Sequence, residues 1–315
     1  MIQRRTVGIV GTGNVGVAAA YALFNQRLAN EIILVDKDQK RAEGEAMDLM
    51  HGQLLVGNVN VRSGNYSDLS NAQVIVISAG ISQGSPDDSR LDLLNKNIEV
   101  FHNIIEQLDS HAPEAILVIA TNPVDILTFA TQQISNRASS KIIGTGTLLD
   151  TARFRSLLGR YYGVDPKSVH AYILGEHGDS EVPIWSQAAI GGKPLKNNEI
   201  LGHHFDDTTM NSLFEQTKNA AYQIIERKGY TNTAIGVVIA RILRAILDDE
   251  SNVLPISINA KGSYDIHDVC LSLPCAIGID GVEGRILPDI SKEEHEGLQH
   301  SATILKEQIK KLDIY

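Results

Sequence analysis

Short apolar runs alternate with stretches of helical periodicity along the first 145 residues. Residues 6–10 and 31–35 are almost entirely apolar, which is typical of strands buried on both faces of a parallel sheet. Strands separated by helical segments predict a doubly wound α/β fold with helices on both sides of the sheet. The expected strands are 6–10, 31–35, 73–78, 115–120 and 141–144, and the expected helices are 17–28, 43–50 and 91–108.

Beyond residue 145 the pattern changes to long helices and short strands, with a hairpin-like turn at 191–194. This half predicts a mixed α+β domain at 146–315 that depends on the first half for any cofactor. The expected helices are 149–162, 206–228, 234–247 and 291–312, and the expected strands are 169–174, 253–258, 264–265, 268–273 and 275–279.

The loop after the first strand carries three glycines, and an acid ends the second strand. Gly11 permits a tight turn, Gly13 lets the backbone approach a pyrophosphate, and Gly16 lets the helix pack on the strand. Asp36 follows Gly16 by 20 residues, where it can accept hydrogen bonds from ribose hydroxyls and repel a 2′-phosphate. The spacing therefore predicts an NAD-binding Rossmann domain at 1–145. The alternative is a glycine turn in an unrelated α/β domain.

Composition narrows the class of protein without identifying it. The chain has 315 residues, of which 43% are hydrophobic and 21% charged, and this is typical of a soluble globular protein. A net charge of −10 without a basic stripe argues against nucleic-acid binding. Cys270 and Cys275 are expected to be reduced core residues, and no metal site is expected. No signal segment or membrane span is apparent, so we expect a cytosolic location.

Three side chains suggest a reaction that moves a proton on a small anionic acid. His177 follows an apolar run in the sequence Gly175-Glu176-His177-Gly178-Asp179. Asp150 and Arg153 are three residues apart and share a face of a helix. An imidazole can transfer a proton, and a guanidinium can bind a carboxylate with two hydrogen bonds. Taken singly, each of these residues is more often structural, so only their combination favours catalysis.

Several motifs together resemble those of the L-lactate/L-malate dehydrogenase superfamily along essentially the full chain. Within it, the sequence is similar to bacterial L-lactate dehydrogenases without the N-terminal arm of vertebrate forms. The motifs are Gly11–Gly16 with Asp36, Thr121–Asp125, Leu149–Arg153, Gly175–Asp179 and Lys228–Thr231.

The resemblance implies a role for each matching residue in reversible NADH-dependent reduction of pyruvate to (S)-lactate. His177 would be the proton donor, Asp150 its carboxylate partner, and Arg153 the clamp for the substrate carboxylate. Arg90, at the end of a polar loop over 81–90, would polarise the substrate carbonyl when the loop closes as a lid. The remaining implied contacts are Asn122, Thr231 and Gln83 to substrate, and Gly11, Gly13, Val15, Gly16, Asp36, Gly80, Asn122 and Ile235 to NAD.

The loop also bears on which acid is the substrate. In this superfamily a glutamine in the lid is typical of lactate enzymes and an arginine of malate enzymes. Counting from Ala79 places Gln83 at that position, whereas counting back from Arg90 places Gly84 there, because this loop is one residue longer than usual. Neither count finds an arginine, so pyruvate is favoured. Malate or another L-2-hydroxy acid remains the alternative.

Arg155 and His170 match the residues with which bacterial lactate dehydrogenases bind fructose 1,6-bisphosphate between subunits. The resemblance thus implies a bisphosphate activator and a homotetramer, although a surface arginine and a strand histidine would explain both residues equally simply. A short-chain dehydrogenase is disfavoured because no tyrosine is followed four residues later by lysine. A non-catalytic NAD-binding sensor, or structural reuse of the fold, stays open.

Overall fold

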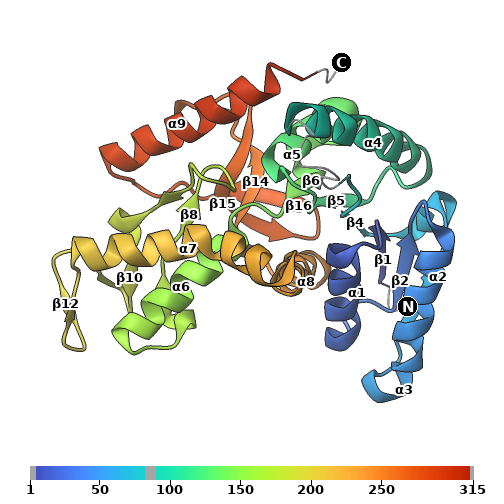
Figure 1. The fold of residues 1–315 in the computed structure, drawn as a ribbon, viewed down its shortest axis with the longest axis horizontal. Helices are drawn as coiled ribbons and strands as arrows, with labels where there is room; N and C mark the ends of the chain where they lie inside the picture. The colour runs from blue at the N-terminus through green and yellow to red at the C-terminus, as the bar shows by residue number, and fades with distance from the viewer. Residues whose placement is uncertain (1–4, 82–89, 313–315) are drawn as a thin grey trace.

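The computed structural model describes residues 5–81 and 90–312. Within these ranges, one sheet of nine strands runs through the molecule in the order β16-β15-β14-β6-β5-β4-β1-β2-β3. Figure 1 shows helices on both sides of its parallel half, with α1 and α2 near one end and α4 and α5 near the other.

The elements of the first half, in chain order, are β1 (Thr6–Val10), α1 (Asn14–Gln26), β2 (Glu31–Val35), α2 (Gln39–His51), α3 (Gln53–Val56), β3 (Asn60–Ser63), β4 (Val74–Ile77), α4 (Arg90–His111), β5 (Ile116–Ile119), α5 (Val124–Ile134) and β6 (Ile142–Gly144). Those of the second half are α6 (Leu148–Tyr162), β7 (Val169–His170), β8 (Ile173–Leu174), β9 (Val182–Pro183), β10 (Ala189–Ile190), β11 (Lys193–Pro194), β12 (Glu199–Ile200), β13 (His203–His204), α7 (Asp207–Lys228), α8 (Thr233–Leu247), β14 (Asn252–Asn259), β15 (Cys270–Gly278), β16 (Gly281–Arg285) and α9 (Lys292–Ile309).

The parallel strands are buried because helices cover both of their faces. β1 pairs with β2 and with β4 in parallel register, so that Val7 lies between Ile32 and Val74. Every residue of β1, β4 and β5 is buried. This explains why their sequences are apolar at each position instead of alternating. The loops that follow these strands lie at the same edge of the sheet, where ligands of such folds bind.

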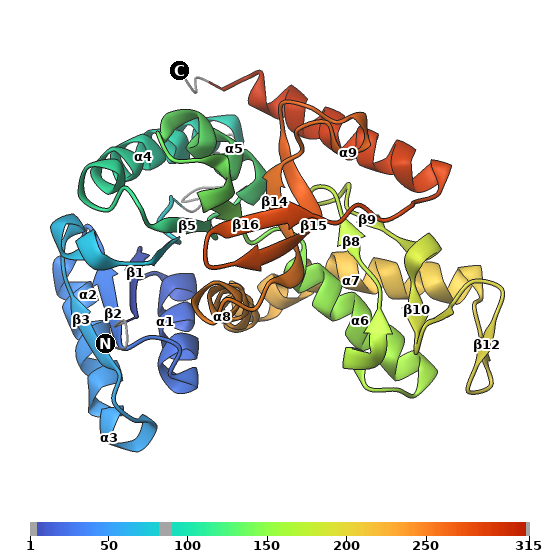
Figure 2. The same cartoon turned by 180° about the vertical axis from the view of Figure 1, so that it is seen from behind.

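The second half of the chain continues the sheet of the first half. β14 pairs antiparallel with β6 through Ser257 and Gly144, and β15 and β16 extend the sheet outward (Figure 2). Helix α8 packs against α1, and Gly236 lies so close that a Cβ there would be 2.6 Å from the Ala18 carbonyl oxygen. The predicted division at residue 145 therefore separates two segments of sequence that share one sheet.

Several predicted elements were wrong in extent or kind. The strand predicted at 169–174 is two short strands, β7 and β8, with different partners. Residues 264–265 form part of a 3-10 turn, Ser263–Asp265, not a strand. The strands predicted at 268–273 and 275–279 are one strand, β15, that continues through Pro274. β3, α5 and β16 were not predicted, and β3 is weakly patterned because it buries only Val61.

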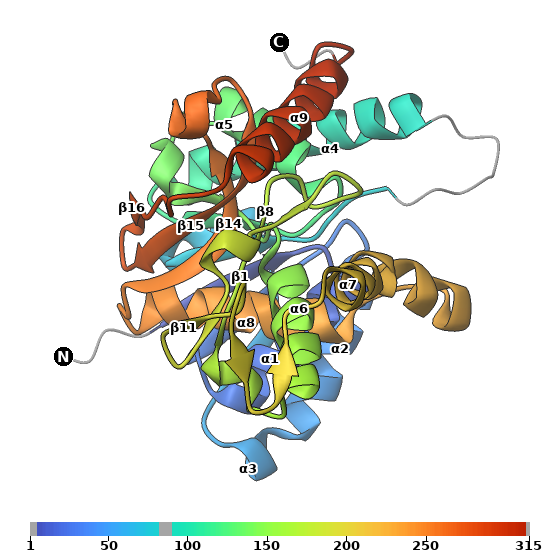
Figure 3. The ribbon, with the colours of Figure 1, turned by 90° about the vertical axis from the view of Figure 1, so that its left-hand side faces the viewer.

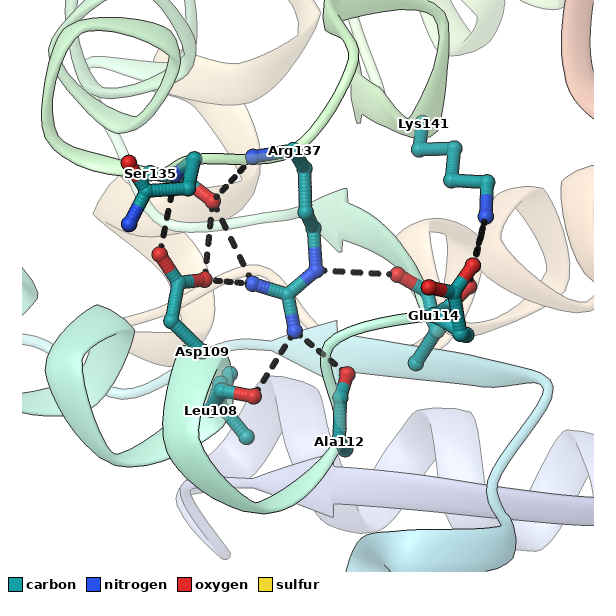
Figure 4. Close-up of polar contacts among 9 residues, drawn as sticks. Leu108, Asp109, Ala112, Glu114, Ser135, Arg137 and Lys141 are labelled. Carbon is teal, nitrogen blue, oxygen red and sulfur yellow. Dashed lines mark hydrogen bonds and ion pairs between the residues drawn. The ribbon is translucent and has the colours of Figure 1, made fainter.

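A buried arginine ties the end of α4 to the segment after α5 (Figure 4). The Arg137 side chain is only 2% exposed, and its guanidinium forms an ion pair with Asp109. It also donates to the carbonyl oxygens of Leu108, Ala112 and Ala115, of which Leu108 lies in the last turn of α4. The carbonyl oxygens of Leu108 and Ala112 also accept hydrogen bonds from the backbone amides of Ala112 and Ala115, so Arg137 adds a second donor to each. Burial lowers the pKa of Arg137 to about 10, so the side chain remains charged at neutral pH.

A smaller apolar cluster lies apart from the sheet, between α6 and the short hairpins of the second half (Figure 3). Phe154 and Trp185 meet edge to face with ring centroids 4.8 Å apart. The hairpin predicted at 191–194 is present as β10 and β11, and Gly191 and Gly192 both adopt positive φ in its turn. In the described ranges, no helix is long and apolar enough to span a membrane.

Candidate active site

The glycine loop has the shape that a dinucleotide requires. Gly11 has φ of +99°, and a Cβ there would lie 2.4 Å from the Ala79 backbone nitrogen. At Gly16 a Cβ would lie 1.9 Å from the Gly11 carbonyl oxygen. Gly13 differs, because no atom stands within 4 Å of the position of its missing Cβ. The loop is therefore packed on the protein side and open at Gly13, next to the N-terminus of α1, where a pyrophosphate would sit.

Asp36 is held in place as an ionised acceptor at the end of β2. Its carboxylate accepts hydrogen bonds from the Thr12 amide at 2.6 Å, the Thr12 hydroxyl at 2.9 Å and the Asp38 amide at 3.0 Å. Burial by itself would raise the pKa of Asp36, but these backbone and side-chain hydrogen bonds lower it overall. A fixed negative charge beside the glycine loop favours ribose hydroxyls over a phosphate ester.

Asp150 and His177, two of the predicted catalytic residues, contact each other in the second half of the chain. Asp150 lies in the first turn of α6, and its Oδ2 is 2.6 Å from His177 Nδ1. Its other oxygen, Oδ1, accepts a hydrogen bond from Arg153 Nη1 at 2.9 Å. His177 follows β8, and its backbone amide donates to Asp125 Oδ2 at 2.7 Å. The imidazole is thus fixed through both its ring and its backbone.

The charges around His177 favour its protonated form. Burial would lower the pKa of His177, but the carboxylate of Asp150, by its charge and its hydrogen bond, raises that pKa to about 9. Burial would likewise raise the pKa of Asp150, and the charges of His177 and Arg153 lower it overall. The His177 side chain is 26% exposed and that of Asp150 only 5%. A buried anion therefore holds a charged imidazole that solvent or a ligand can reach.

Comparison with known proteins agrees with this geometry. Residues 5–144 match the lactate/malate dehydrogenase NAD binding domain, and residues 147–313 match the alpha/beta C-terminal domain of the same enzymes. The chain is 64% identical over 307 residues to an L-lactate dehydrogenase of Salinibacter ruber, which covers 98% of this chain and 97% of that protein. An L-lactate dehydrogenase of Priestia megaterium is 44% identical over 305 residues, with 97% and 96% covered.

A solved structure gives the same result. The minor L-lactate dehydrogenase from Enterococcus mundtii, in a ligands-bound form, is similar with a TM-score of 0.95 at 41% identity, and 98% of each chain is covered. The chain belongs to the lactate/malate dehydrogenase family. The predicted α/β fold, with a Rossmann domain and an α/β C-terminal domain, is confirmed, and NAD is the cofactor of this family member.

The structure places other predicted site residues of this dehydrogenase at the loops around the sheet edge. Gly80 follows β4 and is exposed. The backbone amide of the neighbouring Ile81 donates a hydrogen bond to Asn97 Oδ1 at 2.7 Å. Asn122 follows β5, is exposed and precedes a cis peptide bond to Pro123. Gly80 and Asn122 therefore both lie just after the carboxyl ends of parallel strands, at the sheet edge where ligands were expected.

The remaining predicted residues lie on helices or outside the described ranges. Val15 is in the first turn of α1 and Ile235 in the first turn of α8, and both are partly buried against the main core. Thr231 is half-buried between α7 and α8. Gln83 lies outside the described residues. Arg90 begins α4, and its side chain lies outside the described part of the chain.

Arg155 and His170 occupy neighbouring positions away from the catalytic face of α6. The Arg155 Nε donates to the carbonyl oxygen of Ala171 at 2.8 Å, next to His170 in the chain. The guanidinium also lies over the Tyr172 ring, 5.1 Å from its centroid. His170 is exposed in β7. Arg155 therefore contacts the two residues that follow His170 in the chain.

Two buried acids near His177 were not singled out by sequence reasoning. Burial raises the pKa of Asp125 to about 6, although the His177 amide hydrogen-bonds to it. Burial and the charge of Asp150 raise the pKa of Glu181 to about 8. Asp125 lies in the Thr121–Asp125 motif, which offered a signal. Glu181 offered only an acid at the edge of an apolar run, and such an acid is usually exposed.

Proposed function

We propose that this family member is an NAD-dependent L-lactate dehydrogenase that interconverts pyruvate and (S)-lactate. The observation that supports it best is the chain of contacts from Arg153 through Asp150 to His177, in a chain whose glycine loop is open at Gly13. L-lactate dehydrogenases that match over nearly the whole chain support the same assignment. Malate or another L-2-hydroxy acid is the alternative substrate class.

In the proposed reaction each side chain has a separate task. Bound NADH supplies the hydride that the carbonyl carbon of pyruvate receives. His177 gives a proton from Nε2 to the carbonyl oxygen, while Asp150 accepts the hydrogen bond from Nδ1 and stabilises the charged ring. Arg153 binds the substrate carboxylate with its guanidinium fork. In the reverse direction, neutral His177 takes the proton of the lactate hydroxyl.

The residues that would hold NAD follow from the shape of the glycine loop. The open side of Gly13 and the N-terminus of α1 would bind the pyrophosphate, and Asp36 would accept hydrogen bonds from the adenosine ribose. Gly11, Val15, Gly16 and Gly80 would shape the channel. Asn122 would contact the reacting oxygen and the nicotinamide end, and Ile235 would support the nicotinamide ring.

Replacement of the imidazole tests the catalytic assignment. In His177→Asn the proton donor is lost, and pyruvate reduction should fall by about two to four orders of magnitude. The affinity for NADH, measured by its fluorescence, should remain within about threefold of the original because the glycine loop is unchanged. A variant that keeps its turnover would exclude His177 as the proton donor.

Pyruvate is the proposed substrate because no arginine lies between Ala79 and Ser89 to pair with a second carboxylate. Gln83 would be the lid residue that contacts the substrate methyl group, and Arg90 would polarise its carbonyl. Thr231 would form part of the pocket wall. Comparison of kcat/KM for pyruvate and oxaloacetate decides between the two acids, and faster oxaloacetate reduction would assign the chain to the malate enzymes.

A regulatory site for fructose 1,6-bisphosphate is proposed at Arg155 and His170. Two such pairs, brought together at a two-fold axis between subunits, would neutralise two phosphate groups. The effector should lower KM for pyruvate in the wild type and have no effect in Arg155→Ala. Equal responses in both would remove the site. The proposal also includes a cytosolic location, a role in fermentative glycolysis and a homotetramer. Analytical ultracentrifugation measures the oligomeric state.

A further inference from the structure

Glu181 is buried beside the catalytic residues, yet the proposed reaction does not use it. Its backbone amide donates to the Gly178 carbonyl oxygen at 3.2 Å, in the loop that also carries His177. The next residue, Val182, begins β9 and pairs with Leu174 at the end of β8. The loop that carries His177 and Glu181 therefore connects the two paired strands β8 and β9. Glu181 as a whole is only 6% exposed.

The carboxyl group of Glu181 lies in a cluster of charges without a complete set of partners. Its Oε1 is buried and has no hydrogen-bond partner among the described residues. Asp150 repels its negative charge, whereas His177, Arg153 and Lys218 attract it. Lys218 comes from α7, and Asp150 and Arg153 come from α6, so charges from two helices act on this one carboxyl group. Burial, together with the charge of Asp150, outweighs these attractions and raises the pKa of Glu181 to about 8, so the group is mostly neutral at pH 7.

A neutral Glu181 balances the charges of the loaded site. Protonated His177, Arg153 and Lys218 carry one positive charge each. Asp150 carries one negative charge, and so does Asp125, because its pKa of about 6 leaves it ionised at pH 7. The carboxylate of pyruvate brings the sum to zero. If Glu181 ionises, the buried site holds one negative charge too many, and its carboxylate becomes a second anion for Arg153 to bind.

We propose that Glu181 is a positioning residue that must hold a proton for the substrate carboxylate to bind at Arg153, so that its ionisation weakens substrate binding in alkaline solution. This inference rests on the proposed function, because it takes the ligand to be a 2-oxo acid. Loss of the proton from Glu181 and loss of the proton from His177 then both weaken substrate binding. Binding is complete when Glu181 and His177 are protonated, and it is lost as the pH rises through about 8 and then about 9.

The number of protons taken up on binding distinguishes this proposal from the action of His177 alone. Oxamate, the amide analogue of pyruvate, is titrated into the enzyme–NADH complex by calorimetry at pH 9.5 in two buffers of different ionisation enthalpy. If two groups must be protonated, uptake should be about 1.7 protons per oxamate in the wild type and at most about one in Glu181→Gln. Glu176→Gln, which changes another carboxyl group of the same loop, is the matched control and should behave as wild type.

Two results would overturn the inference. One is uptake of one proton or fewer by the wild type, which needs no variant and so remains decisive if Glu181→Gln does not fold. The other is equal uptake by wild type and Glu181→Gln. Turnover of pyruvate by the wild type at pH 6.5 tests the proposed function separately, because both acids are then protonated whatever their roles.

Discussion

At the scale of single residues, we expect the contact between Asp150 and His177 to set the pH at which the enzyme works. Because the charge of Asp150 raises the pKa of His177 to about 9, the proposed proton donor is charged below that pH and loses its proton as the pH rises through it. In Asp150→Asn this support disappears, while burial still disfavours the charged ring. We expect kcat/KM for pyruvate to fall at least about a hundredfold.

The same substitution should also move the alkaline limit of pyruvate reduction to lower pH. A pH profile of kcat/KM from 6 to 10 measures this, and binding of NADH to Asp150→Asn serves as the control for folding. An alkaline limit that stays at the same pH would mean that another group donates the proton.

The site residues could be predicted where the signal was local in sequence. The spacing of Asp150 and Arg153 predicted a shared helix face, and their side chains do contact each other at 2.9 Å. The burial of Glu181 could not be predicted, because it depends on tertiary packing that the local sequence does not encode. The catalytic and binding roles of all the site residues stay predictions, and the side chains of Gln83 and Arg90 lie outside the described residues.

At the scale of elements, Arg137 fixes where α4 ends. Its guanidinium is almost completely buried and forms an ion pair with Asp109, with backbone carbonyl oxygens and the Ser135 hydroxyl as its other hydrogen-bond partners. In Arg137→Met the volume is retained, but Asp109 loses its ion pair and the carbonyl groups lose the hydrogen bonds that the guanidinium donates. Since removal of one partner from a buried pair is costly, we expect the free energy of unfolding to fall by about 3–5 kcal/mol.

Equilibrium denaturation by urea measures that change. Lys141→Met is the matched control, because Lys141 also forms an ion pair nearby but with the exposed Glu114 (Figure 4). Its midpoint should shift much less. Equal shifts in the two variants would show that the buried pair at Arg137 is no more important than a surface contact.

Elements were predictable where the apolar period was strong and unreliable where tertiary contacts determine the structure. β1 and β2 have the predicted bounds, and the long helices differ by a few residues at their ends. Pro274 suggested a break, yet β15 runs through it, and Pro274 lies opposite Pro255 of β14. Because neither proline has an amide N–H group, this pair leaves no backbone donor without a partner. Residues 264–265 adopt positive φ within a 3-10 turn, which no alternation of side chains encodes.

At the scale of the whole molecule, the two halves behave as one body because they share a sheet and a core. β14 continues the sheet beyond β6, and the main apolar cluster contains residues from both halves. Such sharing predicts a single cooperative unfolding transition, with no stable fragment from residues 1–145 alone. The predicted boundary at 145 would then mark a change of role along the chain, not a unit of independent folding.

The contact between α1 and α8 offers a sharp test of this coupling. In Gly236→Ala the added methyl group would meet the Ala18 carbonyl oxygen at 2.6 Å, so α8 must move away from α1, whose N-terminus is to bind the pyrophosphate. We expect weaker NADH binding, together with a lower midpoint of urea denaturation seen by two probes at once. Those probes are far-ultraviolet circular dichroism and the fluorescence of Trp185, the sole tryptophan of the chain, which lies in the second half.

Gly44→Ala is the control, because nothing lies within 4 Å of its Cβ position in α2, and there the added methyl group should raise stability slightly. Two separate transitions in Gly236→Ala would mean that the halves fold independently despite the common sheet.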